Sequence, residues 1–295
     1  LHEGHLDNHL RICVEEGLDP VTAIRMATLN AAECFDLKDR GAIAPGYRGD
    51  VVLLDDLKDF HVNRVFVEGE LVAEEGKYLP EIKKCDISSV KGSVIVKDFS
   101  KEKFKMNLKS NKVNVIKILP GGVVTAKDTA EIELDANGEF VRNPKVDLVK
   151  VAVVERHQGT GNVACGFLKG YGIKEGAVAL SVAHDSHNII VVGVNDEEME
   201  FAVNSLIEQE GGIVLVKEGK VIESMPMPIA GLMSDQSGEW VDIHEKAYEE
   251  LGICGDVEPV MTLCFMSLAV IPEIKLTDMG LFDVTTFSFI PVEVE

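Results

Sequence analysis

Basic residues are scarce in this sequence. It contains 29 Lys and Arg against 50 Asp and Glu, which gives a formal net charge of −21 at pH 7. Such a charge repels phosphate backbones and anionic lipid surfaces, so we expect neither a nucleic-acid partner nor a membrane partner. Long apolar runs are missing too, because none reaches the roughly 18 residues that a membrane-spanning helix needs.

Several catalytic signatures are also absent. The sequence contains no CxxC pair, no GxSxG nucleophile motif, no GxGxxG and no GK[ST]. These absences disfavour a zinc ribbon, a serine hydrolase, a dinucleotide fold and a P-loop. The six cysteines are scattered along the chain, so we expect reduced thiols and a cytoplasmic protein.

The rest of the composition is that of a folded protein. Hydrophobic residues make up 46% of the 295 positions, enough for real cores, and the length predicts about two domains. The sequence begins with Leu1 in a stretch that looks like the middle of a structure. We therefore expect a fragment of a longer protein.

Three regions follow one another along the chain. Residues 1–40 have the apolar spacing of helices, and the pair Asp19–Pro20 suits a helix N-cap and first turn. Residues 41–80 have the short apolar stretches and Gly turns of a small β-domain, and residues 80–89 are the predicted linker. Residues 90–295 are predicted to be an α+β domain.

Within the α+β region, apolar runs alternate with polar, capped segments. Asn195 suits the N-cap of a long helix, and acidic residues fill its first turn. We predict strands at 94–96, 113–119, 149–154, 177–183 and 189–193, a hairpin at 213–224, and helices at 195–210, 240–252 and 259–269.

The most suggestive polar segment connects two predicted strands. Residues 184–188 are His-Asp-Ser-His-Asn, which places two imidazoles and a carboxylate at one edge of a sheet. Such groups suit recognition of a heterocycle or metal ligation. We interpret His184, Asp185 and His187 as substrate-pocket candidates, ahead of an independent metal site formed by the same three residues. An ordinary turn is the other interpretation, since Asp, Ser and Asn form turns readily.

A second polar segment follows the predicted strand 149–154. Residues 155–162 are Glu-Arg-His-Gln-Gly-Thr-Gly-Asn, and the two glycines allow close backbone approach. Arg156 and His157 are candidates for contact with a substrate or partner, although an ordinary polar loop fits equally well. A third segment, 225–235, is rich in Met and Pro, and we interpret it as core packing. His5 and His9 share a helix face, but the Glu expected directly after the first His of a zinc pair is missing.

Longer stretches resemble a known family. Residues 28–56, TLNAAECFDLKDRGAIAPGYRGDVVLLDD, resemble the end of the catalytic barrel and the adjoining β-sandwich of the amidohydrolase superfamily, with Gly49 where Ala is commoner. Within that superfamily, the sequence resembles the adenine deaminases of the bacterial type more specifically. That resemblance is carried by EGHLDNHLRICVEEG, ERHQGTGN, SVAHDSHNIIVVG, PIAGLMSD and PEIKLTDMGLFDV, in this order from Glu3 to near the end of the chain.

The resemblance implies an α+β fold in three parts. Residues 1–40 would be the terminal helices of a (β/α) barrel, residues 41–80 part of the small β-sandwich, and residues 90–295 the C-terminal domain of an adenine deaminase. It also implies a homo-oligomeric enzyme of purine salvage that hydrolyses adenine to hypoxanthine and ammonia. A binuclear Mn or Fe centre would supply the attacking hydroxide.

The metal ligands of that superfamily are not visible in this sequence, and in particular its HxH pair is missing. We therefore expect the metals to be bound by an N-terminal half outside this chain, and we expect the chain alone to be inactive. Two other readings remain: a non-catalytic oligomerisation or interaction module, and an amidohydrolase of another substrate class.

Overall fold

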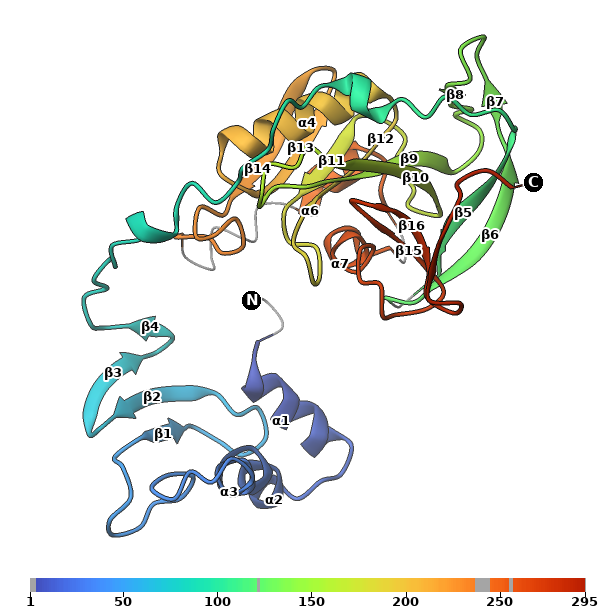
Figure 1. The fold of residues 1–295 in the computed structure, drawn as a ribbon. Helices are drawn as coiled ribbons and strands as arrows, with labels where there is room; N and C mark the ends of the chain where they lie inside the picture. The colour runs from blue at the N-terminus through green and yellow to red at the C-terminus, as the bar shows by residue number, and fades with distance from the viewer. Residues whose placement is uncertain (1–3, 121–122, 237–244, 255–256, 295) are drawn as a thin grey trace. The chain divides into compact units, whose positions relative to one another are not determined.

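The computed structural model describes residues 4–120, 123–236, 245–254 and 257–294 (Figure 1). The chain divides into two compact units, Leu1–Cys85 and Asp86–Glu295. The predicted α+β class is confirmed, since several sheets are combined with a few short helices, and the described residues form no closed barrel. No helix in the described ranges has both the length and the apolar character needed to cross a membrane.

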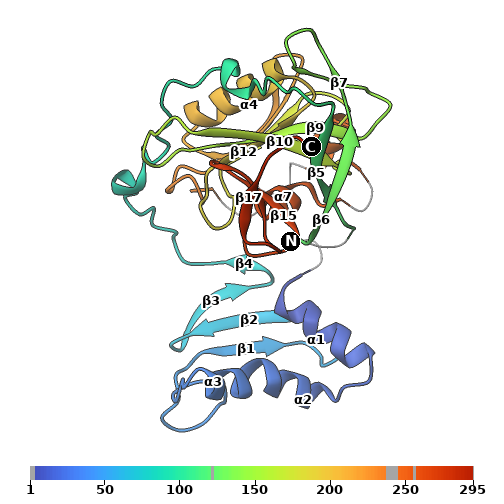
Figure 2. The ribbon, with the colours of Figure 1, turned by 45° about the vertical axis from the view of Figure 1, so that its right-hand side comes forward.

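The first unit combines a helical segment with a small antiparallel sheet. Asp19 caps the second helix as predicted, because its Oδ2 accepts a hydrogen bond of 2.9 Å from the Thr22 N–H. Figure 2 shows the helical segment beside the β1 edge of the sheet. The elements are α1 (Leu6–Glu15), α2 (Pro20–Arg25), a π-helical turn (Met26–Asn30), α3 (Ala31–Cys34), and the strands β1 (Val51–Leu54), β2 (Val62–Val67), β3 (Glu70–Glu74) and β4 (Lys77–Tyr78), paired in that order.

The second unit is built on an eight-stranded sheet of order β14-β13-β11-β12-β9-β10-β5-β6. All neighbouring pairs are antiparallel except β5 and β10, which are parallel. Its strands are β5 (Lys112–Ile118), β6 (Thr125–Glu131), β9 (Leu148–Val154), β10 (Val163–Lys169), β11 (Ala177–Leu180), β12 (Ile189–Gly193), β13 (Gly212–Lys217) and β14 (Lys220–Pro226).

Shorter elements surround this sheet. They are two 3₁₀ turns (Ser88–Val90 and Lys101–Phe104), the pair β7 (Glu133–Leu134) and β8 (Phe140–Val141), the helices α4 (Asp196–Glu208), α6 (Glu245–Glu250) and α7 (Pro259–Cys264), and a three-stranded sheet of β15 (Ile274–Thr277), β16 (Gly280–Asp283) and β17 (Ser288–Ile290).

The central strands are buried on both faces. Along β9, Val149, Val151 and Val153 belong to one hydrophobic core, whereas Ala152 and Val154 belong to another. The first core also contains residues of α6, α7 and β15, and the second contains one face of α4 (Figure 1). This three-layer packing explains why the sequences of these strands are apolar without alternation.

The C-terminal segment runs beside β5. The Asn114 N–H donates to the Val292 carbonyl at 2.7 Å, and the Val294 N–H donates to the Lys112 carbonyl at 2.9 Å. The Glu293 carboxylate accepts hydrogen bonds from the backbone N–H groups of Lys109 and Ser110. The last residues described therefore complete the surroundings of a strand about 180 positions earlier in the sequence.

Most of the predicted elements in the second unit are confirmed. The strands at 113–119, 149–154, 177–183 and 189–193, the hairpin at 213–224 and the helix at 195–210 all occur, with small shifts at their ends. The helix at 259–269 is shorter than predicted, because α7 ends at Cys264. Part of the helix predicted at 240–252 lies outside the described residues, and α6 covers 245–250 of it.

The strand predicted at 94–96 is wrong. Val94 and Val96 pack against the core that includes α4, which accounts for their apolar character. The Ile95 N–H, however, donates to the Arg156 carbonyl at 2.8 Å, and the segment pairs with no strand in the described part of the chain. An extended segment can thus carry strand-like residues without joining a sheet.

Candidate functional site

Residues 184–188, which we name the histidine loop, connect β11 to β12. The loop is anchored at both ends, because the His184 N–H donates to the Cys264 carbonyl at 2.8 Å and the His187 N–H donates to the Ala183 carbonyl at 2.6 Å. The ring centroids of His184 and His187 are 5.2 Å apart, and the ring of His184 also lies 4.9 Å from that of Phe265. The structure therefore brings the two imidazoles of the motif into contact.

The two imidazoles differ from the residues between them in exposure. Asp185 and Ser186 are exposed, whereas His184 and His187 are half-buried. Burial lowers the pKa of His187, and the neighbouring His184 and Arg156 lower it further, against the opposing effect of Asp185. The surroundings therefore favour the neutral form of the His187 ring.

His187 is strained. Its φ of +51° lies in the left-handed region, which a residue with a side chain adopts only at a free-energy cost of about 1–3 kcal/mol. Its Nδ1 is buried and has no hydrogen-bond partner in the structure. Backbone strain and unsatisfied polar atoms of this kind persist where the surroundings impose them, and they cluster at functional sites.

The Glu155 carboxylate organises the loop at 155–162. It accepts hydrogen bonds from the backbone N–H groups of His157 (2.5 Å), Gln158 (2.7 Å) and Thr160 (2.9 Å), and from the Thr160 hydroxyl (3.0 Å). Burial acts to raise the pKa of Glu155, but these four donors outweigh it and lower the pKa to about 2. The loop is thus wrapped around an ionised carboxylate.

Arg156 is turned into the protein. Its side chain is buried, with 1% of the residue exposed, so it cannot reach a ligand at the surface. Its Nε donates to the His187 carbonyl at 2.5 Å, and both terminal nitrogens lie 3.3 Å from the Ala230 carbonyl. No carboxylate among the described residues forms an ion pair with it, and burial lowers its pKa.

Two further contacts join the same segments. His157 is exposed, and its Nε2 donates to the Ser186 carbonyl at 2.6 Å. Asp278, in the turn between β15 and β16, accepts hydrogen bonds from the side-chain amides of Asn188 (3.2 Å) and Asn162 (3.4 Å). Asp278 could not be predicted as part of this place from the sequence pattern, because an isolated Asp in a turn gives no signal of partners 90 and 116 positions away.

The turn at 228–235 lies behind the histidine loop. Besides the contact of Ala230 with Arg156, the Ser181 hydroxyl donates to the Gly231 carbonyl at 2.6 Å. Core packing, the interpretation favoured from the sequence, describes Met225, which is buried, but Met233 is 57% exposed. Four segments far apart in the sequence, around 155–162, 181–188, 228–233 and 278, therefore meet at one place.

The other histidines that suggested chemistry lie in the first unit. His5 precedes α1 without a side-chain capping bond, and His9 lies within that helix. In the described part of the chain, no group of three or more His, Cys, Asp or Glu side chains could hold a metal ion, and this includes the histidine loop. The residues present therefore do not fit the metal centre that the resemblance implies.

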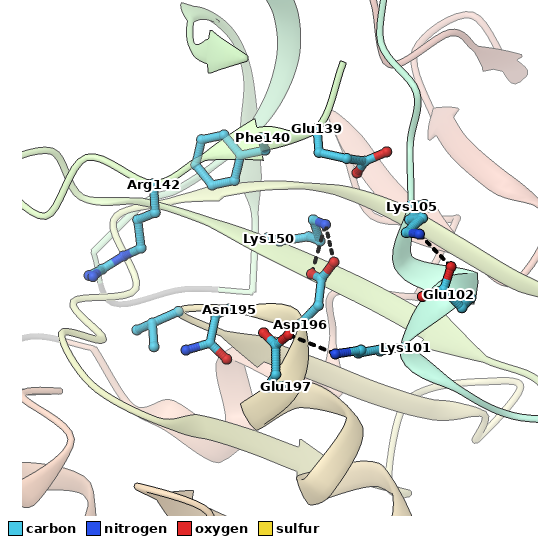
Figure 3. Close-up of a pocket in the computed structure, with 11 residues that line it drawn as sticks. Lys101, Glu102, Lys105, Glu139, Phe140, Arg142, Lys150, Asn195, Asp196 and Glu197 are labelled. Atoms are coloured by element: carbon cyan, nitrogen blue, oxygen red, sulfur yellow. Dashed lines mark hydrogen bonds and ion pairs between the residues drawn. The ribbon is translucent and has the colours of Figure 1, made fainter. Parts of the chain in front are cut away.

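A cavity of about 410 Å³ lies elsewhere in the second unit (Figure 3). Six of its charged side chains form three pairs: Lys150 with Asp196 at 2.7 Å, Lys101 with Glu197 at 2.9 Å, and Lys105 with Glu102. Arg142 also lines the cavity; it donates to the Ile173 carbonyl at 3.0 Å, and its buried Nε has no hydrogen-bond partner in the structure. Lys150 also donates to the Phe104 carbonyl at 3.0 Å. None of the site residues predicted from the sequence lines this cavity, although a Lys in the middle of the apolar run VKVAVV was a signal that could have pointed to it.

Comparison with known families identifies the architecture. The family model of the adenine deaminase C-terminal domain matches residues 122–288, and the model of the amidohydrolase family matches residues 3–72. The chain belongs to the adenine deaminase C-terminal domain family. The segments 155–162, 181–188 and 228–233, and Asp278, all fall within the match to this family.

Individual proteins are similar to this chain across the ranges of both family models. The chain is 66% identical to "Adenine deaminase 2" of Desulfotalea psychrophila over 98% of its own length and 51% of that protein. It is 49% identical to "Adenine deaminase" of Ligilactobacillus salivarius and 48% identical to "Adenine deaminase" of Nitratidesulfovibrio vulgaris, covering 52% of each. The chain thus spans about half the length of these adenine deaminases.

Proposed function

We propose that this chain is the second half of an adenine deaminase, which hydrolyses adenine to hypoxanthine and ammonia. The observation that carries the proposal is the similarity to adenine deaminases along nearly the whole chain, from the amidohydrolase match at 3–72 to the C-terminal domain match at 122–288. A generic amidohydrolase of another substrate class would account for the first match but not for the second.

The parts of the chain are proposed to have the roles that the sequence suggested. Residues 1–40 would complete a catalytic barrel, residues 41–80 would belong to a small β-sandwich, and residues 90–295 would form the C-terminal domain. Since no described cluster fits a metal, we place the metal pair, Mn or Fe, in the half that this chain does not contain. The 295-residue chain supplied with Mn²⁺ and adenine is therefore expected to release no ammonia above the background rate.

The histidine loop is proposed to form part of the adenine pocket. His184, Asp185 and His187 would contact the purine or close over it, and the contact between the two imidazoles supports a joint role. A neutral His187 suits hydrogen bonding to ring nitrogens, since neutral imidazole carries one donor and one acceptor. His157 would support the loop from its exposed side through the Ser186 carbonyl.

The remaining parts of the proposal concern the cellular setting. We propose a homo-oligomeric enzyme of purine salvage in the cytoplasm. The six cysteines support the location, because all of them are free thiols in the structure.

A chimera tests the proposed activity. The matching half of the Desulfotalea psychrophila protein is replaced by this chain, which the 66% identity makes feasible. We expect the purified chimera to release ammonia and hypoxanthine from adenine when Mn²⁺ or Fe²⁺ is present, and to stop when the metal is chelated. A folded, metal-loaded chimera that leaves adenine unchanged, alongside an active parent enzyme, would contradict the proposal.

The same chimera tests the histidine loop. His187→Ala is expected to lower kcat/KM for adenine by about 10- to 100-fold, because a positioned polar contact to the reacting ring is lost. His61→Ala serves as the matched control, because His61 is an exposed histidine of the first unit whose ring pairs with Asp55 at 2.6 Å and does not belong to the histidine loop. Equal kinetics for the two variants would leave the histidine loop as an ordinary turn.

A further inference from the structure

We infer that Arg156 is a positioning residue, whose buried guanidinium holds the histidine loop in the geometry that its proposed role requires. This inference rests on the proposed function of that loop. The Arg156 side chain does not reach substrate in this proposal, since the residue is 1% exposed and the hydrogen bonds of its guanidinium go to backbone carbonyls of its own unit.

The two carbonyls that Arg156 binds belong to strained residues. His187 has a φ of +51° and Ala230 a φ of +57°, and neither is a glycine. A residue with a Cβ leaves this region unless its neighbours hold it there. One planar guanidinium, with several donors in a fixed geometry, therefore fixes two left-handed residues that are 43 positions apart in the sequence.

The packing leaves room for this arrangement only because residue 231 is glycine. A Cβ built on Gly231 would lie 2.6 Å from Nη1 of Arg156 and 3.0 Å from its Cζ. Gly231→Ala would thus displace the guanidinium while keeping its charge. Gly219 offers a matched control, since its φ of +67° is close to the +70° of Gly231 but a Cβ there would meet nothing within 4 Å.

The decisive experiment measures amide hydrogen exchange in the 295-residue chain. In Gly231→Ala, the His187 N–H and the flanking loop amides are expected to exchange at least about tenfold faster than in the unchanged chain, while Gly219→Ala leaves them unchanged. Because both alanines carry the same backbone strain, the difference reports the displaced guanidinium. Equal exchange rates at the histidine loop in the two variants would overturn the inference.

A second arm removes the side chain. Arg156→Ala is expected to speed loop exchange in the same way, and about 50 mM guanidinium chloride should restore protection where the same concentration of NaCl does not. Arg156→Lys should restore it only in part, because an ammonium cannot bridge the two carbonyls with a planar fork. Failure of guanidinium to restore a loop that Arg156→Ala has loosened would also count against the inference.

An NMR titration of the His187 ring separates positioning from general stabilisation. The groups that act on this ring are His184, Arg156 and His157, which disfavour its protonation, and Asp185, which favours it. Loss of the guanidinium in Arg156→Ala should raise the pKa of His187 toward its ordinary value, whereas Gly219→Ala should not change it. An inactive chimera would contradict the proposed function alone, since these measurements on the chain still decide the role of Arg156.

Discussion

Two buried cations of the second unit, Arg156 and Lys150, have opposite surroundings. Lys150 faces a cavity and is paired with the Asp196 carboxylate, whose own side chain is 27% exposed (Figure 3). Arg156 has no carboxylate partner in the described residues and binds the carbonyls of His187 and Ala230. The cavity has a volume of about 410 Å³, yet the polar segments 155–162, 181–188 and 228–233 meet around Arg156 and not at the cavity.

The two regions differ in how far their polar groups are satisfied within the protein. The cavity's three lysines are already paired with acids at its rim, whereas the Arg142 guanidinium in its lining donates to the Ile173 carbonyl. The histidine loop instead combines a strained residue, an unsatisfied imidazole nitrogen and a buried unpaired guanidinium. Such costs are typical of sites selected for something other than stability.

The largest effect is expected when Arg156 is replaced. Arg156→Met should lower the free energy of unfolding of the second unit by about 3–4 kcal/mol, because two buried carbonyls lose their donor and two strained residues lose their support. Urea unfolding followed by circular dichroism measures this loss. A loss below about 1 kcal/mol would mean that the carbonyls find other partners. Arg156 would then contribute no more to stability than Lys150.

Glu155 should have the next largest effect. Its folded-state pKa of about 2 lies below the ordinary value of 4.5, so its contribution is complete above about pH 4.5 and is lost as the pH falls toward 2. Glu155→Gln should lower the free energy of unfolding at pH 7 by about 2–3 kcal/mol. The variant should also lose stability less steeply than the unchanged chain between pH 4.5 and 2, which parallel urea titrations would reveal; equal slopes would contradict the assignment.

Lys150 should have the smallest effect of the three. Lys150→Met leaves Asp196 at the N-terminal turn of α4, where water in the cavity and the helix N–H groups can stabilise the carboxylate. We therefore expect a loss of about 1–2 kcal/mol in the same unfolding assay. A loss larger than that of Arg156→Met would reverse the comparison and make the cavity the more tightly constrained region.

The sequence predicted well what depends on local chemistry. The long helix begins where Asn195 can cap it, and its Oδ1 accepts from the Glu198 N–H at 2.8 Å. The apolar runs at 149–154 and 189–193 became strands because burial on both faces of a sheet demands continuous hydrophobic residues. Residues 94–96 had the same apolar character, but they pack against the core that includes α4 without pairing with a strand in the described residues. Their composition therefore indicated burial and not membership of a sheet.

The candidate site was predicted in part. The motif His184 to Asn188 stood out by composition, and so did Arg156, but the inward direction of Arg156 depends on long-range packing that no local pattern encodes. The link through Asp278 likewise exists only because the turn between β15 and β16 is folded against the main sheet. Whether these residues contact adenine stays a prediction until the chimera is assayed.

The position of the C-terminal segment beside β5 has a consequence for how the second unit is made. During synthesis, β5 emerges about 180 residues before Glu293, whose carboxylate accepts from the Ser110 N–H. Closing so long a loop is slow, so this unit reaches its final form only after the residues around Glu293 have left the ribosome. A ribosome-stalled chain ending near Ile290 should therefore remain sensitive to protease around residues 109–114, and a longer chain in which Glu293 has left the ribosome should be protected there.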